Sequence, residues 1–513
     1  MVRVMMTSLD RELLVVRTEV RARRTTPVAW LPVAVVAAGL VALLLVFANE
    51  YGYAPDELYF RLLGKRGLAW GYVDQPPLLP MVVRAATAVF GDSVWGIRVP
   101  AMLCAAAVTV LGAVMAAELG GTRRAQTLTA FAVGTSALVL NFGHYIVTNS
   151  LDTVAWAAVL VCVLRALLRD QGVWWCWAGL VVGVALYAKY IVLLLVAALL
   201  LGLLLAGPRK VFADRWLYAG AGLGLAIGSP NLIYQATHDF PQLHMAQALG
   251  STDGTAYRAM FVTNLVLLLG PLLFVLCMIG LVQLFRVPEW KPVRALGIGY
   301  VVAAAASYLV DGGRPDYTGG LLIALLAVGC VVADRWVGTR TLRLVTLVLV
   351  LVLGAVLQVV LSLPVIPRSE FHKFQRAGRS LQDVGWQQLA AQAEAAYRAL
   401  PDADRADAVL LTQNFAEAGA LDRYGHGLPA IYSGHNGLYE WGAPPDSAGV
   451  VIAIGVDPAR LAADFGSCRT VDTVDNRLGI DNPEQGRPIT VCRDREKPWA
   501  ALWPGYRHLS AYP

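Results

Sequence analysis

The chain has 513 residues, of which 57% are hydrophobic and only 15% are charged, and its formal net charge is +6. Soluble domains carry about 25% charged residues, so this composition excludes an ordinary soluble domain and indicates a membrane protein. The cationic residues form short clusters between apolar runs, where they orient helices in a bilayer. The net charge therefore gives no reason to expect a nucleic-acid partner.

The N-terminal segment, residues 1–27, holds six arginines against three acidic residues and is followed by an apolar run over 28–48. This pattern resembles a signal peptide, but the apolar run exceeds the about 7–15 residues of a signal-peptide core. No small-x-small cleavage site follows it. We predict a basic cytoplasmic N-terminus and a retained first transmembrane helix.

Apolar segments long enough to cross a bilayer recur along the chain up to residue 363. A span needs about 20 apolar residues. The predicted spans are 28–48, 93–118, 125–142, 150–168, 173–188, 190–206, 217–235, 259–285, 295–310, 318–336 and 342–363. With the N-terminus inside, every predicted cytoplasmic loop carries arginine, and most external loops carry fewer cations. Residues 28–363 are therefore predicted to form a polytopic helical bundle of about eleven spans.

The first external loop, residues 49–92, is longer than a simple connection between two spans. Its stretches "DELYFRLLGKRGLAW" and "PLLPMVVRAATAVFG" mix apolar and cationic residues but are too short and polar to span. We predict two amphipathic helices that lie in the membrane interface and help to shape a cavity at the outer surface.

Residues 364–513 follow an odd number of spans and are predicted to lie outside the cytoplasm as a small α/β domain. Strand-like runs cover 406–413, 449–456 and 487–494, and helical patterns cover 415–425 and 459–466. The predicted fold class is thus mainly α, a transmembrane helical bundle with a C-terminal α/β domain.

Two of the seven cysteines, Cys468 and Cys492, lie in this polar C-terminal segment. In an oxidising compartment such a pair forms a disulfide, which we predict here. The alternative is a pair of reduced thiols. The other five cysteines lie in or beside apolar segments, where free cysteine behaves as a small hydrophobic residue.

Four groups of polar residues fall at the outer ends of the predicted helices, and this shared side suggests a common site. They comprise Asp56–Glu57 with Asp74 and Gln75 in the same loop, Asp152, Lys189, and the segment 311–317 with Arg314 and Tyr317. Each has a simpler explanation. Asp152 could stabilise a helix dipole, Lys189 could extend to the interface, and Asp56 could belong to a solvated loop.

Other motifs limit the chemistry. Three external histidines, His144, His238 and His244, lack metal-ligand spacing on a helix, so a metal site has weak support and a divalent metal stays open as a cofactor. The sequence has no phosphate-binding loop for ATP and no serine or cysteine nucleophile elbow.

Several stretches together resemble a known family. They are the "DE" pair at 56–57, "GYVDQPPL" at 71–78, "FGDSVWGIRVPA" at 90–101, Asp152, "KY" at 189–190, and segments 230–241 and 411–442. The combination resembles bacterial members of the protein-mannosyltransferase-like group of glycosyltransferase family 39, in the GT-C superfamily, which also includes lipid A aminoarabinose transferases.

This resemblance implies a multi-pass enzyme of the bacterial inner (plasma) membrane with an extracytoplasmic active site. Its donor would be a polyprenyl-phosphate sugar, its acceptor a lipid, glycan or protein, and transfer would invert the anomeric carbon. Asp56 matches the catalytic base, and Glu57 and Asp152 would position the acceptor or the base.

Further residues are assigned to the two substrates by the same resemblance. Lys189 would bind the donor phosphate, with Arg61, Arg314 and Tyr317 as further donor-binding residues. Tyr59, Asp74 and His238 are candidates for the acceptor or for shaping the loop. Gln75 departs from the lysine found in the aminoarabinose transferases, so one phosphate contact is missing or comes from Arg61 or Arg314.

Two other classes of function compete with a glycosyltransferase. A transporter or flippase of lipid-linked sugars would place ionisable groups near the bilayer midplane and show internal repeats, whereas these groups cluster at one face. A binding module with a membrane anchor would not need eleven spans. The sugar, the acceptor and the role of the C-terminal domain do not follow from the sequence.

Overall fold

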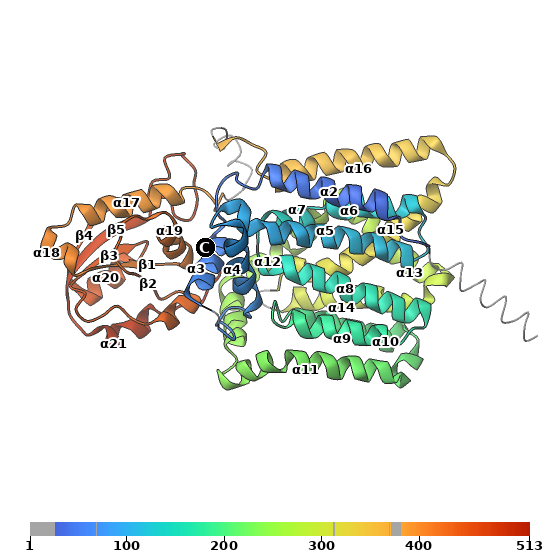
Figure 1. Cartoon of the computed structure of the whole chain (residues 1–513), viewed down its shortest axis with the longest axis horizontal. Helices are drawn as coiled ribbons and strands as arrows, with labels where there is room; N and C mark the ends of the chain where they lie inside the picture. Colours follow the sequence, from blue (N-terminus) through green and yellow to red (C-terminus); the bar gives the residue numbers. More distant parts are fainter. Residues whose placement is uncertain (1–25, 68, 311–312, 369, 371–380, 513) are drawn as a thin grey trace, which may run out of the picture.

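A computed structural model describes residues 26–512 except 68, 311–312, 369 and 371–380, and leaves out the side chains of 251–257. Most of the predicted basic N-terminus therefore lies outside the described residues, as do Asp311 and Gly312. Figure 1 shows a bundle of long helices with an α/β domain at one end of it.

Every predicted span is helical, although two of them are broken. The helices of the bundle are α2 (Trp30–Val46), α5 (Val94–Glu118), α6 (Arg123–Gly134), α7 (Ala137–His144), α8 (Thr148–Arg169), α9 (Trp174–Ala185), α10 (Val192–Ala206), α11 (Arg215–Thr237), α12 (Pro241–Leu269), α13 (Pro271–Arg286), α14 (Ala295–Leu309), α15 (Gly319–Val337) and α16 (Thr341–Ser362).

Among the described residues, four helical segments are long and apolar enough to cross a membrane: α5, α8, α16 and the segment Pro315–Val337 that ends in α15. The count rises to six if each of two bent pairs is one span. The pair α6–α7 bends by 57°, and α12–α13 bends by 95° at Gly270, whose φ is +86°. The sequence predicted about eleven spans, and several of the corresponding apolar helices have only 12–17 residues.

The first external loop contains the two predicted helices, α3 (Pro55–Arg66) and α4 (Leu78–Phe90). On α4 the buried residues recur every three or four positions, as in an amphipathic helix. In contrast, nine of the 12 residues of α3 are buried. Helix α3 is thus largely covered by the C-terminal domain, and its place in the membrane interface stays a prediction.

The C-terminal domain is built on one five-stranded sheet of order β2-β1-β3-β5-β4. The β1–β2 and β1–β3 pairs are parallel, and β5 runs antiparallel to both β3 and β4. Its elements are α17 (Trp386–Arg398), α18 (Asp402–Ala406), β1 (Ala408–Thr412), α19 (Phe415–Tyr424), β2 (Ile431–Ser433), η6 (Asn436–Trp441), β3 (Val450–Ile454), α20 (Pro458–Asp464), β4 (Phe465–Thr473), β5 (Pro488–Arg495) and α21 (Trp499–Leu502).

The three predicted strands and both predicted helices of this domain are present, whereas the prediction missed β2 and β4. Both missed strands lie at the edges of the sheet, and β4 is exposed along nearly its whole length. An exposed edge strand lacks the apolar run that marks a buried strand.

One face of the sheet is covered by α17 and α19, and α19 in turn packs on α3. Leu410, Ile452 and Ile454 on that face share a hydrophobic cluster with Leu58 and Leu62 of α3. The helices approach closely at Gly419 of α19, where a Cβ would lie 2.7 Å from the Leu58 Cβ. Helix α3 is therefore held between the bundle and the C-terminal domain.

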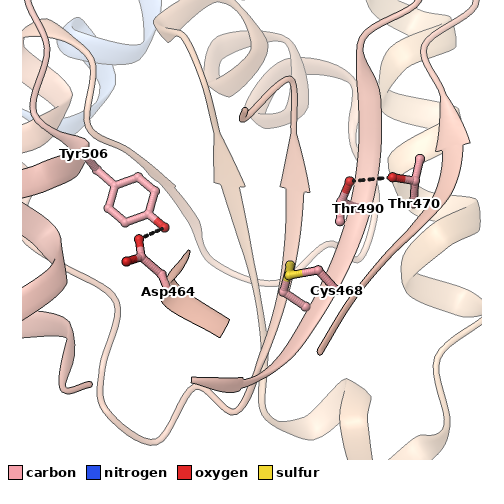
Figure 2. The surroundings of a disulfide bond; sticks show 6 residues. Asp464, Cys468, Thr470, Thr490 and Tyr506 are labelled. Atoms are coloured by element: carbon pink, nitrogen blue, oxygen red, sulfur yellow. Dashed lines mark hydrogen bonds between the residues drawn. A yellow bond between two sulfur atoms is a disulfide. The ribbon is translucent and has the colours of Figure 1, made fainter. Parts of the chain in front are cut away.

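The predicted disulfide between Cys468 and Cys492 is present and joins the directly paired residues of β4 and β5. Figure 2 shows it beside the side-chain hydrogen bond between Thr470 and Thr490, which links the same two strands. The edge strand β4 is thereby attached covalently to its neighbour β5.

Candidate active site

A cavity of about 630 Å³ opens where the end of the bundle, the first external loop and the C-terminal domain meet. Its lining includes six of the predicted site residues: Asp56, Tyr59, Asp74, Lys189, Arg314 and Tyr317. They come from α3, the α3–α4 loop, the α9–α10 turn and the segment before α15. The fold thus brings together residues that lie up to about 260 positions apart in the sequence.

Asp56 lies in the first turn of α3 and lines the cavity. Burial raises the pKa of its carboxyl, while the positive charges of Arg314 and Lys189 oppose that rise and the neighbouring Glu57 adds to it. A carboxylate near a helix N-terminus and two cations can stay ionised in spite of burial. Asp56 is therefore suited to accept a proton.

Glu57 does not line the cavity and points into the protein. Its carboxylate accepts hydrogen bonds from the backbone N–H groups of Ala54 (2.9 Å) and Ile146 (3.0 Å), and pairs with Arg98 of α5. Both charged side chains are fully buried. Glu57 therefore fixes the N-terminus of α3, and with it the position of the adjacent Asp56.

A cationic group occupies another part of the cavity wall. The Lys189 Nζ donates to Asn149 Oδ1 at 2.6 Å and lies 4.9 Å from the centre of the Tyr317 ring. Asn149 in turn donates to Asp316. Lys189 and Arg314 interact electrostatically, so two positive charges face the same space. This arrangement favours an anionic group such as a phosphate.

Asp152 is buried near the start of α8 and does not line the cavity. Its Oδ1 accepts a hydrogen bond from the Trp156 indole at 3.1 Å, and its charge lies within electrostatic range of Lys189. The structure therefore places Asp152 behind the cationic group as a counter-charge.

Asp74 and Tyr59 join the bundle to the C-terminal domain. The Tyr59 hydroxyl donates to Asp74 Oδ1 at 3.0 Å and accepts from the Gly437 backbone N–H at 3.0 Å. Burial raises the pKa of Asp74 to about 7, and its interaction with Asp56 contributes to the rise. Asp74 and Asp56 therefore act on each other across the cavity.

Two other predicted site residues lie elsewhere. Arg61 forms ion pairs with Asp92 and Asp422 at 2.5 and 2.7 Å and does not line the cavity, so its predicted contact with the donor phosphate is not retained. His238 is exposed and stacks on Tyr234 at 4.0 Å. Within the described residues, no group of three or more His, Cys, Asp or Glu side chains could hold a metal ion.

Sequence reasoning missed the contribution of the C-terminal domain to the cavity. Phe415, Asn436, Ser510 and Tyr512 line it, and so does Asp383, which accepts a hydrogen bond from the Tyr145 hydroxyl at 2.8 Å. These residues follow the last predicted span by some distance, and no motif links them to Asp56. The only signal was the stretch 411–442, which contains Phe415 and Asn436.

This fold, a polytopic helical bundle with a cavity beneath an α/β domain, is found in solved structures. The chain is similar to ArnT from Cupriavidus metallidurans bound to undecaprenyl phosphate, with a TM-score of 0.62, 15% identity, and coverage of 91% of this chain and 98% of that one. The apo form of the same ArnT matches with a TM-score of 0.58, 14% identity, and coverage of 90% and 97%.

A more distant similarity connects the chain to AglB, the oligosaccharyltransferase of Archaeoglobus fulgidus, in complex with an inhibitory peptide and a dolichol-phosphate. That match has a TM-score of 0.50, 13% identity, and coverage of 83% of this chain and 69% of that one. At these identities the structural comparisons establish the fold alone, which this chain shares with ArnT and AglB. No curated protein sequence matches the chain.

Residues 74–234 match the sequence model of the family described as dolichyl-phosphate-mannose-protein mannosyltransferase. This segment runs from Asp74 through Asp152 and Lys189 to Tyr234. The segment similar to this mannosyltransferase family therefore contains three of the predicted site residues, and the chain as a whole has a fold similar to that of ArnT.

Proposed function

We propose that the protein transfers a sugar from a polyprenyl-phosphate donor to an acceptor hydroxyl, with Asp56 as general base and inversion at the anomeric carbon. The observation that carries this proposal is the cavity in which Asp56 shares one space with Lys189 and Arg314. A base beside two cations suits a reaction in which a hydroxyl attacks and a phosphate leaves.

In the proposed step, the acceptor oxygen attacks the anomeric carbon while Asp56 removes the hydroxyl proton. The bond between the anomeric carbon and the phosphate oxygen breaks, and the electron pair leaves with the lipid phosphate. Lys189 and Arg314 stabilise the negative charge that grows on that phosphate. Attack from the face opposite the leaving group inverts the anomeric configuration.

The proposed location is the bacterial plasma membrane, with the cavity and the C-terminal domain outside the cytoplasm. Two observations support this orientation. Every predicted cytoplasmic loop carries arginine, in agreement with the positive-inside rule. The Cys468–Cys492 disulfide in the domain beside the cavity suits an oxidising compartment.

The test uses the purified full chain in nanodiscs with a panel of polyprenyl phosphates that carry radiolabelled hexoses or pentoses. Asp56→Asn keeps the shape of the side chain and should lower transfer by about 10²–10⁴-fold. Asp494→Asn is the matched control, because Asp494 is exposed in the C-terminal domain and asparagine tolerates its φ of +56°. Transfer by Asp56→Asn at the wild-type rate would refute the assignment of the base.

A further inference from the structure

A second groove lies between the end of α3 and the C-terminal domain. Its volume is about 500 Å³, which falls within the range of about 300–1,000 Å³ that is usual for ligand sites. Its lining comes from the last two turns of α3, from α19 and the segment after it, from β2 and from η6. None of the residues described as lining it also lines the active-site cavity. We call it the β2 groove.

The β2 groove follows the edge of the sheet rather than one of its faces. Strand β2 is the last strand on its side of the sheet, and among the described residues it pairs with β1 alone. Its three residues, Ile431, Tyr432 and Ser433, all line the groove. Successive side chains of a strand point to opposite faces of a sheet. A groove that meets all three residues therefore lies along the strand edge.

The backbone groups on the outer side of β2 belong to Ile431 and Ser433. In the parallel β1–β2 pair, Leu410 lies opposite Ile431, and its N–H donates to the Ala430 carbonyl at 2.9 Å. In a parallel ladder, one residue of such a pair bonds to both chain neighbours of the other. The N–H and C=O of Ile431 therefore point away from β1, as do those of Ser433 two positions later. An edge of this kind can take up a further strand.

The opposite edge of the sheet is less suited to strand addition. Strand β4 has an irregular register between Thr470 and Asp472, and it exposes the charged side chains of Arg469 and Asp472. Bulges and charged residues keep an edge strand from pairing with another chain. Strand β2 has neither feature, since its sequence is Ile-Tyr-Ser and its pairing with β1 is regular.

The lining of the β2 groove can accommodate the side chains of an added strand. Three buried leucines supply an apolar surface: Leu62 of α3, Leu421 of α19 and Leu438 of η6. Gly427 and Gly442 also line the groove, and a Cβ on either glycine would meet no atom within 4 Å. Alternate side chains of an added strand would therefore have an apolar surface on one side and open space elsewhere.

The charged residues of the β2 groove favour an acidic partner. They are Lys65, Arg66 and Asp422, two cations and one carboxylate. Both Asp422 oxygens are in ion pairs, one with Lys65 at 2.7 Å and the other with Arg61 at 2.7 Å. Arg66 is exposed and stacks on the Trp441 ring, with 4.2 Å between its guanidinium carbon and the ring centre. A stacked guanidinium keeps its in-plane N–H groups, so Arg66 can bind a carboxylate.

We propose that the β2 groove is the docking site for an extended segment of a partner protein, which adds a strand to β2 and places an acidic side chain on Arg66. The backbone of Ile431 and Ser433 supplies the hydrogen bonds of the new strand. This interaction goes beyond the proposed transfer reaction, in which no residue of the groove takes part. Helix α3 carries Asp56 at its start and Arg66 at its end, so a docked partner is held about 15 Å along the helix axis from Asp56.

The experiment selects random eight-residue peptides, displayed on phage, against the full chain in nanodiscs. The best peptide is then labelled with fluorescein, and its Kd is measured by fluorescence anisotropy. The selected sequences should alternate apolar with polar residues and contain an acidic residue. A scan with N-methylated backbone amides tests the pairing itself. Methylation at alternate positions should weaken binding about tenfold, the effect of one lost hydrogen bond, and methylation between them should change little.

Variants of the chain test the two sides of the contact. Ile431→Pro removes an outward N–H and keeps the bonds to β1, because an edge strand tolerates proline on its free side. It should weaken the peptide about tenfold. Arg66→Gln should have a similar effect, and none on a peptide whose acidic residue is replaced by glutamine. Arg469→Gln, the matched change on the opposite edge strand, should bind as the wild type does.

The outcomes separate this proposal from the proposed function. Asp56→Asn should bind the peptide as the wild type does, although it should not transfer sugar. The docking site is overturned if no peptide is selected, if the N-methyl scan shows no alternation, or if Ile431→Pro and Arg66→Gln both bind the peptide normally. Each of these results leaves the transfer reaction untouched, since that reaction is tested by the activity of Asp56→Asn.

Discussion

Glu57 and Arg98 form a fully buried ion pair directly behind the proposed catalytic residue, with a Glu57 Oε2 to Arg98 Nη2 distance of 2.8 Å. Arg98 also donates to the carbonyl oxygens of Ala48 at 2.9 Å and Gly52 at 2.6 Å. The pair therefore ties the segment after α2, the start of α3 and helix α5 to one another. It fixes the turn of helix on which Asp56 lies.

Glu57→Gln should destabilise the full chain by about 3–5 kcal/mol, because it removes the carboxylate that pairs with the fully buried Arg98 charge. The measurement is thermal unfolding in detergent, followed by intrinsic tryptophan fluorescence. The double variant Glu57→Leu/Arg98→Met removes both charges and should recover part of the lost stability. Unfolding of Glu57→Gln at the wild-type temperature would show that the pair contributes little.

Asp74→Asn should change how stability depends on pH. Burial raises the pKa of Asp74 from 3.8 to about 7, so the folded protein favours the protonated form. The contribution of the protonated Asp74 carboxyl to the free energy of unfolding is fully present below about pH 4. It is lost as the pH rises through 7. The variant keeps an acceptor for the Tyr59 hydroxyl but cannot ionise. Its midpoint of unfolding should therefore exceed that of the wild type at pH 8.5.

The control for this titration is the same comparison at pH 4.5, where the side chain of the wild type is mostly uncharged. There the two proteins should unfold at similar temperatures. A constant difference between them at both pH values would mean that Asp74 does not titrate in this range. The amide change would then act through packing alone.

The bundle was predictable because its signal is local. Apolar runs such as those of α5, α8 and α16 identify themselves by length and composition. The burial of α3 was not predictable, since its cationic residues Arg61 and Lys65 are typical of an interfacial helix. They pair instead with Asp422 of α19, more than 350 residues away.

The candidate site was predictable in part. Asp56, Lys189 and Arg314 could be grouped from the sequence because alternating spans place them on the same side of the membrane. The sequence could not show that Glu57 faces away from its neighbour Asp56, since this depends on the position of Arg98 on another helix. Nor could it show that Tyr512 reaches the cavity, since that contact depends on tertiary packing.

Reduction of the Cys468–Cys492 disulfide should lower the stability of the C-terminal domain by about 2–4 kcal/mol, because it frees a loop with a sequence separation of 24 residues. Thermal unfolding of the full chain with and without reductant measures the effect. The variant Cys468→Ala/Cys492→Ala should unfold like the reduced wild type and should not respond to reductant. A wild type that also fails to respond would mean that the bridge adds no stability.

Glu417 and Glu484 form a buried carboxyl pair, and Glu484 accepts a hydrogen bond from Tyr512, which lines the cavity. One oxygen of each, Glu417 Oε1 and Glu484 Oε2, has no hydrogen-bond partner, whereas the Glu417 Oε2 accepts from the backbone N–H groups of Gln413 at 2.8 Å and Asn414 at 3.1 Å. Burial and the charge of Glu484 hold the pKa of Glu417 well above its usual value. A proton shared between the two carboxyls removes their repulsion.

Glu417→Gln should therefore raise the midpoint of unfolding at neutral and alkaline pH. In the wild type, the protonated Glu417 carboxyl contributes fully to the free energy of unfolding below about pH 4.5. This contribution is lost as the pH rises through the raised pKa of Glu417. The amide of the variant keeps an oxygen for the two backbone N–H groups and gives Glu484 a donor at every pH. Glu394→Gln, on α17, is the comparison variant outside this pair. If Glu417→Gln unfolds below the wild type at pH 8, the two carboxyls do not repel each other in the folded protein.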